Sequence, residues 1–124
     1  MDMLHHVILS LASNYEQERH LMEARRLLAC ILQPTRYTEE LWTEPFGKPH
    51  RPDMYINQLL YATTSLSVED LLKRLKSIEL QMGRTAEERG EGIVRIDLDL
   101  MKYDDDIYHP RDWERPYIQR LLLS

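Results

Sequence analysis

Cysteine, phenylalanine and glycine are scarce in this sequence: its 124 residues include one Cys, one Phe and four Gly. The single cysteine, Cys30, excludes a disulfide framework and is typical of a reducing compartment. Long apolar runs are absent as well, since none approaches the roughly 20 residues that span a bilayer. The first residues carry neither a basic segment nor a signal-peptide cleavage site. We therefore expect a cytoplasmic protein without a membrane partner.

Positive charge is also in deficit, because 16 Lys and Arg face 21 Asp and Glu, for a net charge of -5. A broad nucleic-acid surface needs an excess of basic residues, so we expect no nucleic-acid partner. A small phosphate ligand stays possible, because it needs only a local basic pocket and a metal. The 43% hydrophobic and 30% charged fractions are those of an ordinary soluble globule. A chain of this length predicts one domain, residues 1–124.

The most informative stretch runs from residue 93 to residue 101, where apolar and charged positions alternate. This period of two predicts a β-strand with one buried face. Asp97 and Asp99 would lie on its other face, roughly 6.5–7 Å apart, and direct two carboxylates to one place. Such a pair repels unless a cation lies between its members, and it suits Mg²⁺. A solvated strand face neutralised by Arg95 is an equally good interpretation.

The remaining patterns predict further strands and two helices. Ser13 followed by Glu16 is a capping-box pattern that predicts the start of the first helix, and Pro34 predicts its end. Ser67 predicts the start of the second helix, and Gly83 is its C-cap candidate. We expect strands over 4–11, 35–43 and 55–63, loops over 44–53 and 84–92, a solvated turn over 104–106, and a short helix or extended tail over 108–124.

The resulting order, β-α-β-β-α-β, predicts an α+β, ferredoxin-like fold with an antiparallel sheet and both helices on one face. Many unrelated functions use this fold, so it does not decide the activity. Tyr55 and Asn57 share a face of one strand and could hold a flat heterocycle with polar edges; an edge-strand Asn facing water is the competing interpretation. The Pro-rich loop around Phe46 could form a ligand-binding wall or a plain connection.

Seven short motifs follow one another along nearly the whole chain: Leu11-Ala12-Ser13-Asn14, Thr43-Glu44-Pro45-Phe46-Gly47, Tyr55-Ile56-Asn57, Ser65-Leu66-Ser67, Ile78-Glu79 with Gly83-Arg84, Ile96-Asp97-Leu98-Asp99-Leu100, and His109-Pro110-Arg111 with Glu114-Arg115-Pro116-Tyr117. In this order and spacing the sequence resembles the 6-hydroxymethyl-7,8-dihydropterin pyrophosphokinase family of folate biosynthesis. The resemblance implies transfer of pyrophosphate from ATP to the pterin, with release of AMP.

The resemblance also implies a role for each matching residue. It implies Asp97 and Asp99 as ligands of two Mg²⁺ ions that bridge the phosphates of ATP. The implied sets are catalytic Arg84, Arg95, Asp97 and Asp99; substrate-binding Thr43, Phe46, Tyr55, Asn57 and Tyr117; and nucleotide-binding Glu79, Leu100, His109, Arg111 and Arg115. A homodimer, in which a second subunit supplies part of the substrate wall, is left open.

The segment before the metal-binding strand departs from the family pattern. Glu91 stands at the position where the family has Trp, and Val94 stands where it has a phosphate-binding Arg. Arg95 is displaced by one residue, which on a regular strand moves a side chain to the opposite face, so we expect it beside Asp97 in a salt bridge. The competing hypotheses are therefore a slow pyrophosphokinase, a non-catalytic relative that binds pterin or nucleotide, and an interaction module without a small ligand.

Overall fold

The computed structural model describes residues 3–45 and 51–124, and the strands in these ranges form one antiparallel sheet. They are β1 (His5–Ser13), β2 (Gln33–Tyr37), β3 (Leu41–Thr43), β4 (Tyr55–Thr64), β5 (Asp97–Tyr103) and β6 (Asp106–Ile107). The order across the sheet is β2-β4-β1-β5-β6, and β3 pairs with the beginning of β4 whereas β2 pairs with its end.

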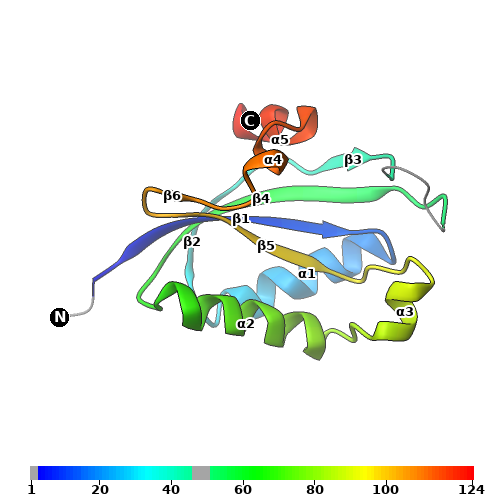
Figure 1. Cartoon of the computed structure of the whole chain (residues 1–124), viewed down its shortest axis with the longest axis horizontal. Coiled ribbons are helices and arrows are strands. Elements are labelled where there is room, and N and C mark those ends of the chain that lie inside the picture. The colour runs from blue at the N-terminus through cyan, green and yellow to red at the C-terminus, as the bar shows by residue number, and fades with distance from the viewer. Residues whose placement is uncertain (1–2, 46–50) are drawn as a thin grey trace.

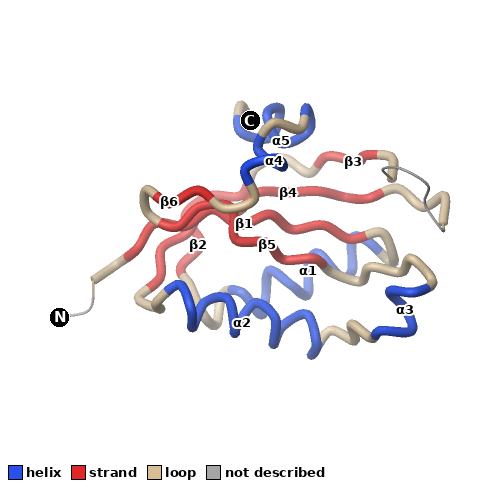
Figure 2. Tube along the Cα trace, viewed as in Figure 1, coloured by secondary structure: helices blue, strands red, loops and turns tan. Residues whose placement is uncertain are grey.

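Helices lie on both sides of this sheet (Figure 1). The long helices α1 (Gln17–Leu28) and α2 (Val68–Gln81) cover one face, and the short helices α4 (Pro110–Trp113) and α5 (Pro116–Leu122) cover part of the other. Figure 2 shows the strands as the layer between them. The fold is therefore the ferredoxin-like α+β arrangement that the sequence predicted. No helix of the described ranges is long and apolar enough to cross a membrane.

Two apolar clusters hold these layers together. The larger cluster lies between the sheet and the long helices. There α2 buries a stripe of Leu71, Leu75 and Ile78, and its C-cap Met82 continues this stripe. The smaller cluster lies on the opposite face and contains Leu59, Met101, Ile118 and Leu121. Because Ile118 and Leu121 belong to α5, this second cluster fixes the C-terminal helix against β4 and β5.

The start of the second helix is as predicted, and its C-cap is Met82, one residue before the predicted Gly83. The Ser67 hydroxyl accepts a hydrogen bond from the Asp70 backbone N–H at 3.2 Å, so Ser67 is the N-cap. Gly83 follows the helix at a φ of +100°, where a side chain would be strained, and its N–H bonds to the Leu80 carbonyl at 3.1 Å.

Both predicted ends of the first helix are wrong. The N-cap is Glu16, in a left-handed conformation, and the Ser13 hydroxyl instead donates to the carbonyls of Tyr15 and Val94. The helix ends at Leu28, and Pro34 lies in β2. Proline is tolerated there because β2 is an edge strand and its pairing with β4 shifts register next to Pro34.

Three other predicted elements need correction. The segment 35–43 forms two strands rather than one, because Thr38 between them bonds to Leu59 of β4 through both its N–H and its hydroxyl. The predicted loop over 84–92 contains α3 (Ala86–Gly90), capped by Thr85, and the strand predicted from residue 93 begins at Asp97. The solvated turn is confirmed at Asp104 and Asp105, whereas Asp106 begins β6. The tail forms α4 and α5, each with proline at its first turn.

Candidate active site

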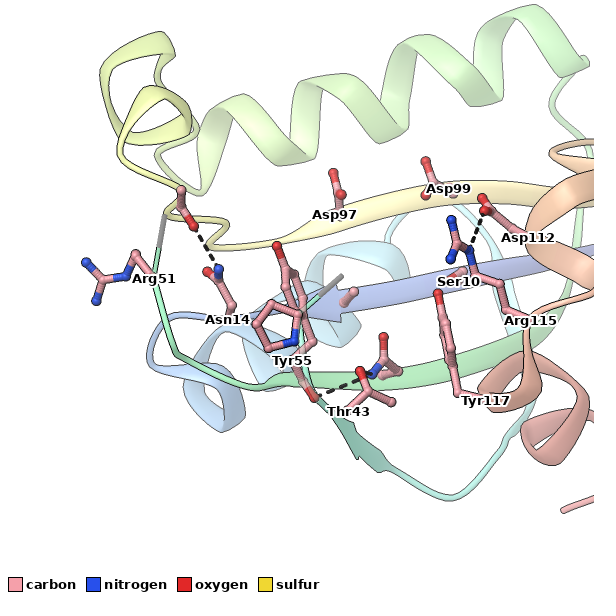
Figure 3. Close-up of a pocket in the computed structure, with 14 residues that line it drawn as sticks. Ser10, Asn14, Thr43, Arg51, Tyr55, Asp97, Asp99, Asp112, Arg115 and Tyr117 are labelled. Atoms are coloured by element: carbon pink, nitrogen blue, oxygen red, sulfur yellow. Dashed lines mark hydrogen bonds and ion pairs between the residues drawn. The ribbon is translucent and has the colours of Figure 1, made fainter. Parts of the chain in front are cut away.

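A cavity of about 370 Å³ opens on the sheet face that α4 and α5 partly cover (Figure 3). Its walls come from β1, β3, β4, β5 and the α4–α5 segment. The lining residues are Ser10, Ala12, Asn14, Thr43, Pro45, Arg51, Tyr55, Asn57, Gly92, Asp97, Asp99, Asp112, Arg115 and Tyr117. Six of the predicted catalytic and substrate-binding residues therefore meet in one place: Thr43, Tyr55, Asn57, Asp97, Asp99 and Tyr117.

Asp97 and Asp99 project from the same side of β5, as the strand alternation predicted (Figure 3). Their cross-strand partners in β1 are the small residues Ala12 and Ser10, which leave space above the sheet. Burial, and secondarily the charge of Asp97, raises the pKa of Asp99. The charge of Asp97 thus disfavours the ionised form of Asp99, which is a condition under which a cation binds favourably.

The oxygen donors of this pair fit Mg²⁺, which proteins usually hold with one or two carboxylates plus substrate phosphates. Within residues 3–45 and 51–124, no group of three or more His, Cys, Asp or Glu side chains could hold a metal ion. The remaining coordination positions of an ion at Asp97 and Asp99 would therefore belong to phosphate oxygens and water.

Arg84 lies next to the carboxylate pair because the buried Glu79 holds it there. Glu79, at 5% exposure, accepts hydrogen bonds from the Leu98 backbone N–H of β5 at 2.8 Å and from the Arg84 guanidinium. Arg84 Nη1 is also 3.7 Å from Asp97 Oδ1. Burial raises the pKa of Glu79, against the opposing effects of the Leu98 N–H and of Arg84.

The opposite wall combines two aromatic rings with an amide. Asn57 Nδ2 donates to the Thr43 hydroxyl at 2.8 Å and to the Leu41 carbonyl at 3.1 Å, which fixes the side chain against β3. None of the described residues donates a hydrogen bond to Asn57 Oδ1. Tyr55 enters the cavity from β4 and Tyr117 from α5, and burial raises the pKa of both phenols.

The prediction that Arg95 lies beside Asp97 is wrong. Asn14 accepts a hydrogen bond from the Val94 N–H at 2.7 Å through its side chain and donates its own N–H to the Val94 carbonyl at 2.9 Å. These bonds replace the regular strand that the alternation assumed. Arg95 instead forms a two-point ion pair with Glu88, at 2.8 Å from Nε and from Nη2, and lies over the Tyr15 ring.

A second cavity, of about 460 Å³, adjoins the first through their shared lining residue Asp99. It brings together three residues of the predicted nucleotide-binding set, Glu79, Leu100 and His109, with the predicted catalytic Arg84. Of the other two nucleotide-binding predictions, Arg115 lines the first cavity and Arg111 lines a smaller hollow at the start of α4. Phe46 lies outside the described residues.

Several lining residues had no role in the sequence analysis. Asp112 accepts from Arg115 Nε at 3.0 Å, and their spacing of three residues was the available signal. Arg51 lines the cavity and forms an ion pair with Asp53. Both lie in a loop, where the sequence does not predict which way a side chain points. Ser10 faces the cavity because alternate residues of β1 point to this face of the sheet. Both faces of the sheet are covered, so the sequence of β1 does not show which face carries the site.

Comparison with known proteins agrees with this geometry. A family model described as 7,8-dihydro-6-hydroxymethylpterin-pyrophosphokinase (HPPK) matches residues 8–124. The chain is 27% identical to a 2-amino-4-hydroxy-6-hydroxymethyldihydropteridine pyrophosphokinase of Porphyromonas gingivalis, over 95% of this chain and 88% of that protein.

Two longer plant proteins also resemble the chain. It is 31% identical to the folate synthesis bifunctional protein of Arabidopsis thaliana and 34% identical to the mitochondrial one of Pisum sativum, in each case over 95% of this chain. The chain spans about a quarter of these plant proteins, 26% and 24% of their lengths.

Proposed function

The chain belongs to the 7,8-dihydro-6-hydroxymethylpterin-pyrophosphokinase family, and from this premise we propose that it transfers the β,γ-pyrophosphoryl group of ATP to 6-hydroxymethyl-7,8-dihydropterin in folate biosynthesis. The pterin hydroxymethyl oxygen forms a bond to the β-phosphorus. The bond between this phosphorus and the oxygen bridging to the α-phosphorus breaks, AMP leaves with that oxygen, and the hydroxyl proton passes to solvent. The observation that carries the proposal is the cavity that joins a carboxylate pair to an aromatic and amide wall.

The aromatic and amide wall suits the pterin. Tyr55 and Tyr117 line the cavity, and a flat heterocycle such as the pterin can stack on their rings and be buried between them. Asn57 Oδ1 can accept a hydrogen bond from an N–H of the pterin edge, because the amide nitrogen is already held by Thr43. The substrate is thereby oriented in the plane of its ring as well as perpendicular to it.

The carboxylate wall suits the phosphates. Asp97 and Asp99 would hold Mg²⁺, which when bound would neutralise part of the phosphate charge. Arg84 lies beside this pair and can donate to a phosphate oxygen with the guanidinium N–H groups that Glu79 does not use. The second cavity, which begins at Asp99, gives the nucleoside end of ATP a place next to Leu100 and His109.

The experiment that tests the proposal measures AMP released from Mg-ATP with and without 6-hydroxymethyl-7,8-dihydropterin. We expect AMP only when the pterin is present, and none with the Asp97→Ala variant. Asp105→Ala is the matched control, because it removes an exposed carboxylate from the turn after β5 and should leave the rate unchanged. Pterin binding without AMP release would identify a non-catalytic relative, and neither binding nor release would contradict the proposal.

A further inference from the structure

Arg95 does not lie on the side of the site that would bind the phosphates. The family pattern puts an arginine where this chain has Val94, and the neighbouring Arg95 is paired with Glu88 over the Tyr15 ring. Its Cδ also packs against Gly83, where an added Cβ would lie 3.3 Å away. Arg95 is therefore held on the far side of the connection between α2 and β5, away from Asp97 and Asp99.

The short helix α3 carries another arginine next to Glu88. Neighbouring residues of a helix differ in direction by about 100°, so Glu88 and Arg89 face different surroundings. Glu88 points to Arg95, whereas Arg89 lines the second cavity together with Arg84, Asp99 and His109. Thr85 fixes the start of this helix by accepting a hydrogen bond from the Glu88 N–H at 3.1 Å. The same cap therefore sets the direction of both side chains.

Arg89 also lies close to the boundary between the two cavities. Burial and then the charge of Asp97 raise the pKa of Tyr55, and the charge of Arg89 opposes them, so the phenol lies within the influence of both charges. Tyr55 lines the first cavity and Arg89 lines the second. A group that extends from the pterin-binding wall past Asp99 toward the nucleoside end would pass this guanidinium.

The guanidinium of Arg89 differs from those of Arg84 and Arg95 in its surroundings. Within the described ranges it makes no hydrogen bond and no ion pair, whereas Arg84 is held by Glu79 and Arg95 by Glu88. A guanidinium without a carboxylate partner keeps all its donors for a ligand, and its planar fork matches two oxygens of a phosphate group.

We propose that Arg89 is a second catalytic arginine, which binds the triphosphate and occupies the role that the family pattern gives to the position of Val94. The inference rests on the proposed function and adds a residue to it. Arg84 and Arg89 would approach the phosphates from the end of α2 and from α3, on the side opposite the aromatic wall. Charge on the transferred group's equatorial oxygens would then meet two guanidinium groups in addition to the metal site.

The test compares Arg89→Ala, Arg89→Lys, Arg95→Ala and Arg74→Ala. Arg74 lies exposed on α2, outside the lining of either cavity, and is the matched control for loss of a positive charge. We expect Arg89→Ala to lower kcat/KM for Mg-ATP by about 10²- to 10³-fold at saturating pterin, somewhat less than the loss of a fully engaged transition-state arginine. Arg89→Lys should recover part of the loss, since it restores the charge but not the fork. Arg74→Ala should match the wild type.

A calorimetric titration of a non-hydrolysable ATP analogue with Mg²⁺ gives a readout that does not need turnover. We expect weaker analogue binding in Arg89→Ala and unchanged pterin binding. Thermal unfolding should also be unchanged, because the Arg89 side chain makes no hydrogen bond or ion pair with a described residue and its backbone hydrogen bonds remain in the variant. If Arg95→Ala weakens binding and Arg89→Ala does not, or if Arg89→Ala behaves like Arg74→Ala, the inference is wrong. A wild type that binds the analogue but releases no AMP would contradict the proposed function while still testing Arg89, and a wild type that binds no analogue would overturn both.

Discussion

Two arginine–glutamate pairs flank the connection between α2 and β5, and they differ in what surrounds them. Arg84 and Glu79 form the inner pair: Glu79 is 5% exposed, and its other carboxylate oxygen accepts the Leu98 N–H. Arg95 and Glu88 form the outer pair, which lies against Gly83 and the Tyr15 ring. The guanidinium of Arg84 in the inner pair lies next to Asp97, whereas that of Arg95 in the outer pair points away from it.

In the connection between α2 and β5, the direction of each paired arginine side chain follows from the location of its acidic partner. Glu79 is fixed by a turn of α2 and by the backbone of β5, so Arg84 can point only toward the site. Glu88 belongs to the separate helix α3, and the Asn14 hydrogen bonds to Val94 set the backbone that precedes Arg95. For Arg84 and Arg95, the location of the acidic partner, rather than the spacing from Asp97, decides which of the two reaches the cavity.

The largest expected difference between the two pairs is in catalysis. We expect Arg84→Ala to lower kcat by about 10³-fold, because removing an arginine that contacts a transferring phosphoryl group costs 10³–10⁵ where it has been measured. Arg84→Lys should recover part of the rate. Steady-state kinetics with both substrates saturating measures the effect, and Arg95→Ala in the same assay supplies the comparison. A larger loss in Arg95→Ala than in Arg84→Ala would reverse the assignment.

The second difference is in stability. We expect Glu79→Ala to lower the free energy of unfolding by about 3 kcal/mol, because it leaves Arg84 and the Leu98 N–H without a buried partner. Glu88→Ala should cost at most about 1 kcal/mol, since its pair with Arg95 lies near the surface. Urea denaturation of both variants measures these values. If both variants lost the same free energy of unfolding, the greater burial of Glu79 would not make its ion pair more important for stability.

The smallest effect is a pH dependence that Glu79 contributes. Burial raises its pKa in the folded chain, so the folded state holds a proton at pH values where the unfolded state has lost it. The contribution of Glu79 to stability is therefore fully present below the ordinary Glu pKa of about 4.3 and declines as pH rises through the raised value. The free energy of unfolding of the wild type minus that of Glu79→Gln should fall as pH rises. Urea denaturation between about pH 4 and 7 measures it, and a difference that grows with pH would contradict this sign.

The part of the site that lies on strands and helices was predictable from the sequence, because in these elements the spacing of residues decides which way their side chains point. Alternation placed Asp97 and Asp99 on one face of β5, and the motif with Tyr55 and Asn57 placed both in one wall. The helical stripe of α2 and the Ser67 cap were equally readable, since each depends on residues close in sequence.

The connection before β5 was not predictable in the same way. Its course depends on Asn14, about eighty residues earlier in the chain, which bonds to Gly92 and Val94. The Thr85 and Glu88 spacing of a capping box was a local signal for α3, but the charged composition of the segment led to a loop assignment. The direction of Arg89 and Arg95 follows from these two features, so it required the structure.

A ³¹P NMR spectrum of the complete reaction with ATP, Mg²⁺ and 6-hydroxymethyl-7,8-dihydropterin shows directly which phosphorus atom is attacked. We expect the three ATP signals to be replaced by the single resonance of AMP and by two coupled resonances of a pterin diphosphate ester, which requires attack at the β-phosphorus. Formation of ADP with a pterin monophosphate ester, or ATP signals that do not change when the pterin is added, would contradict it.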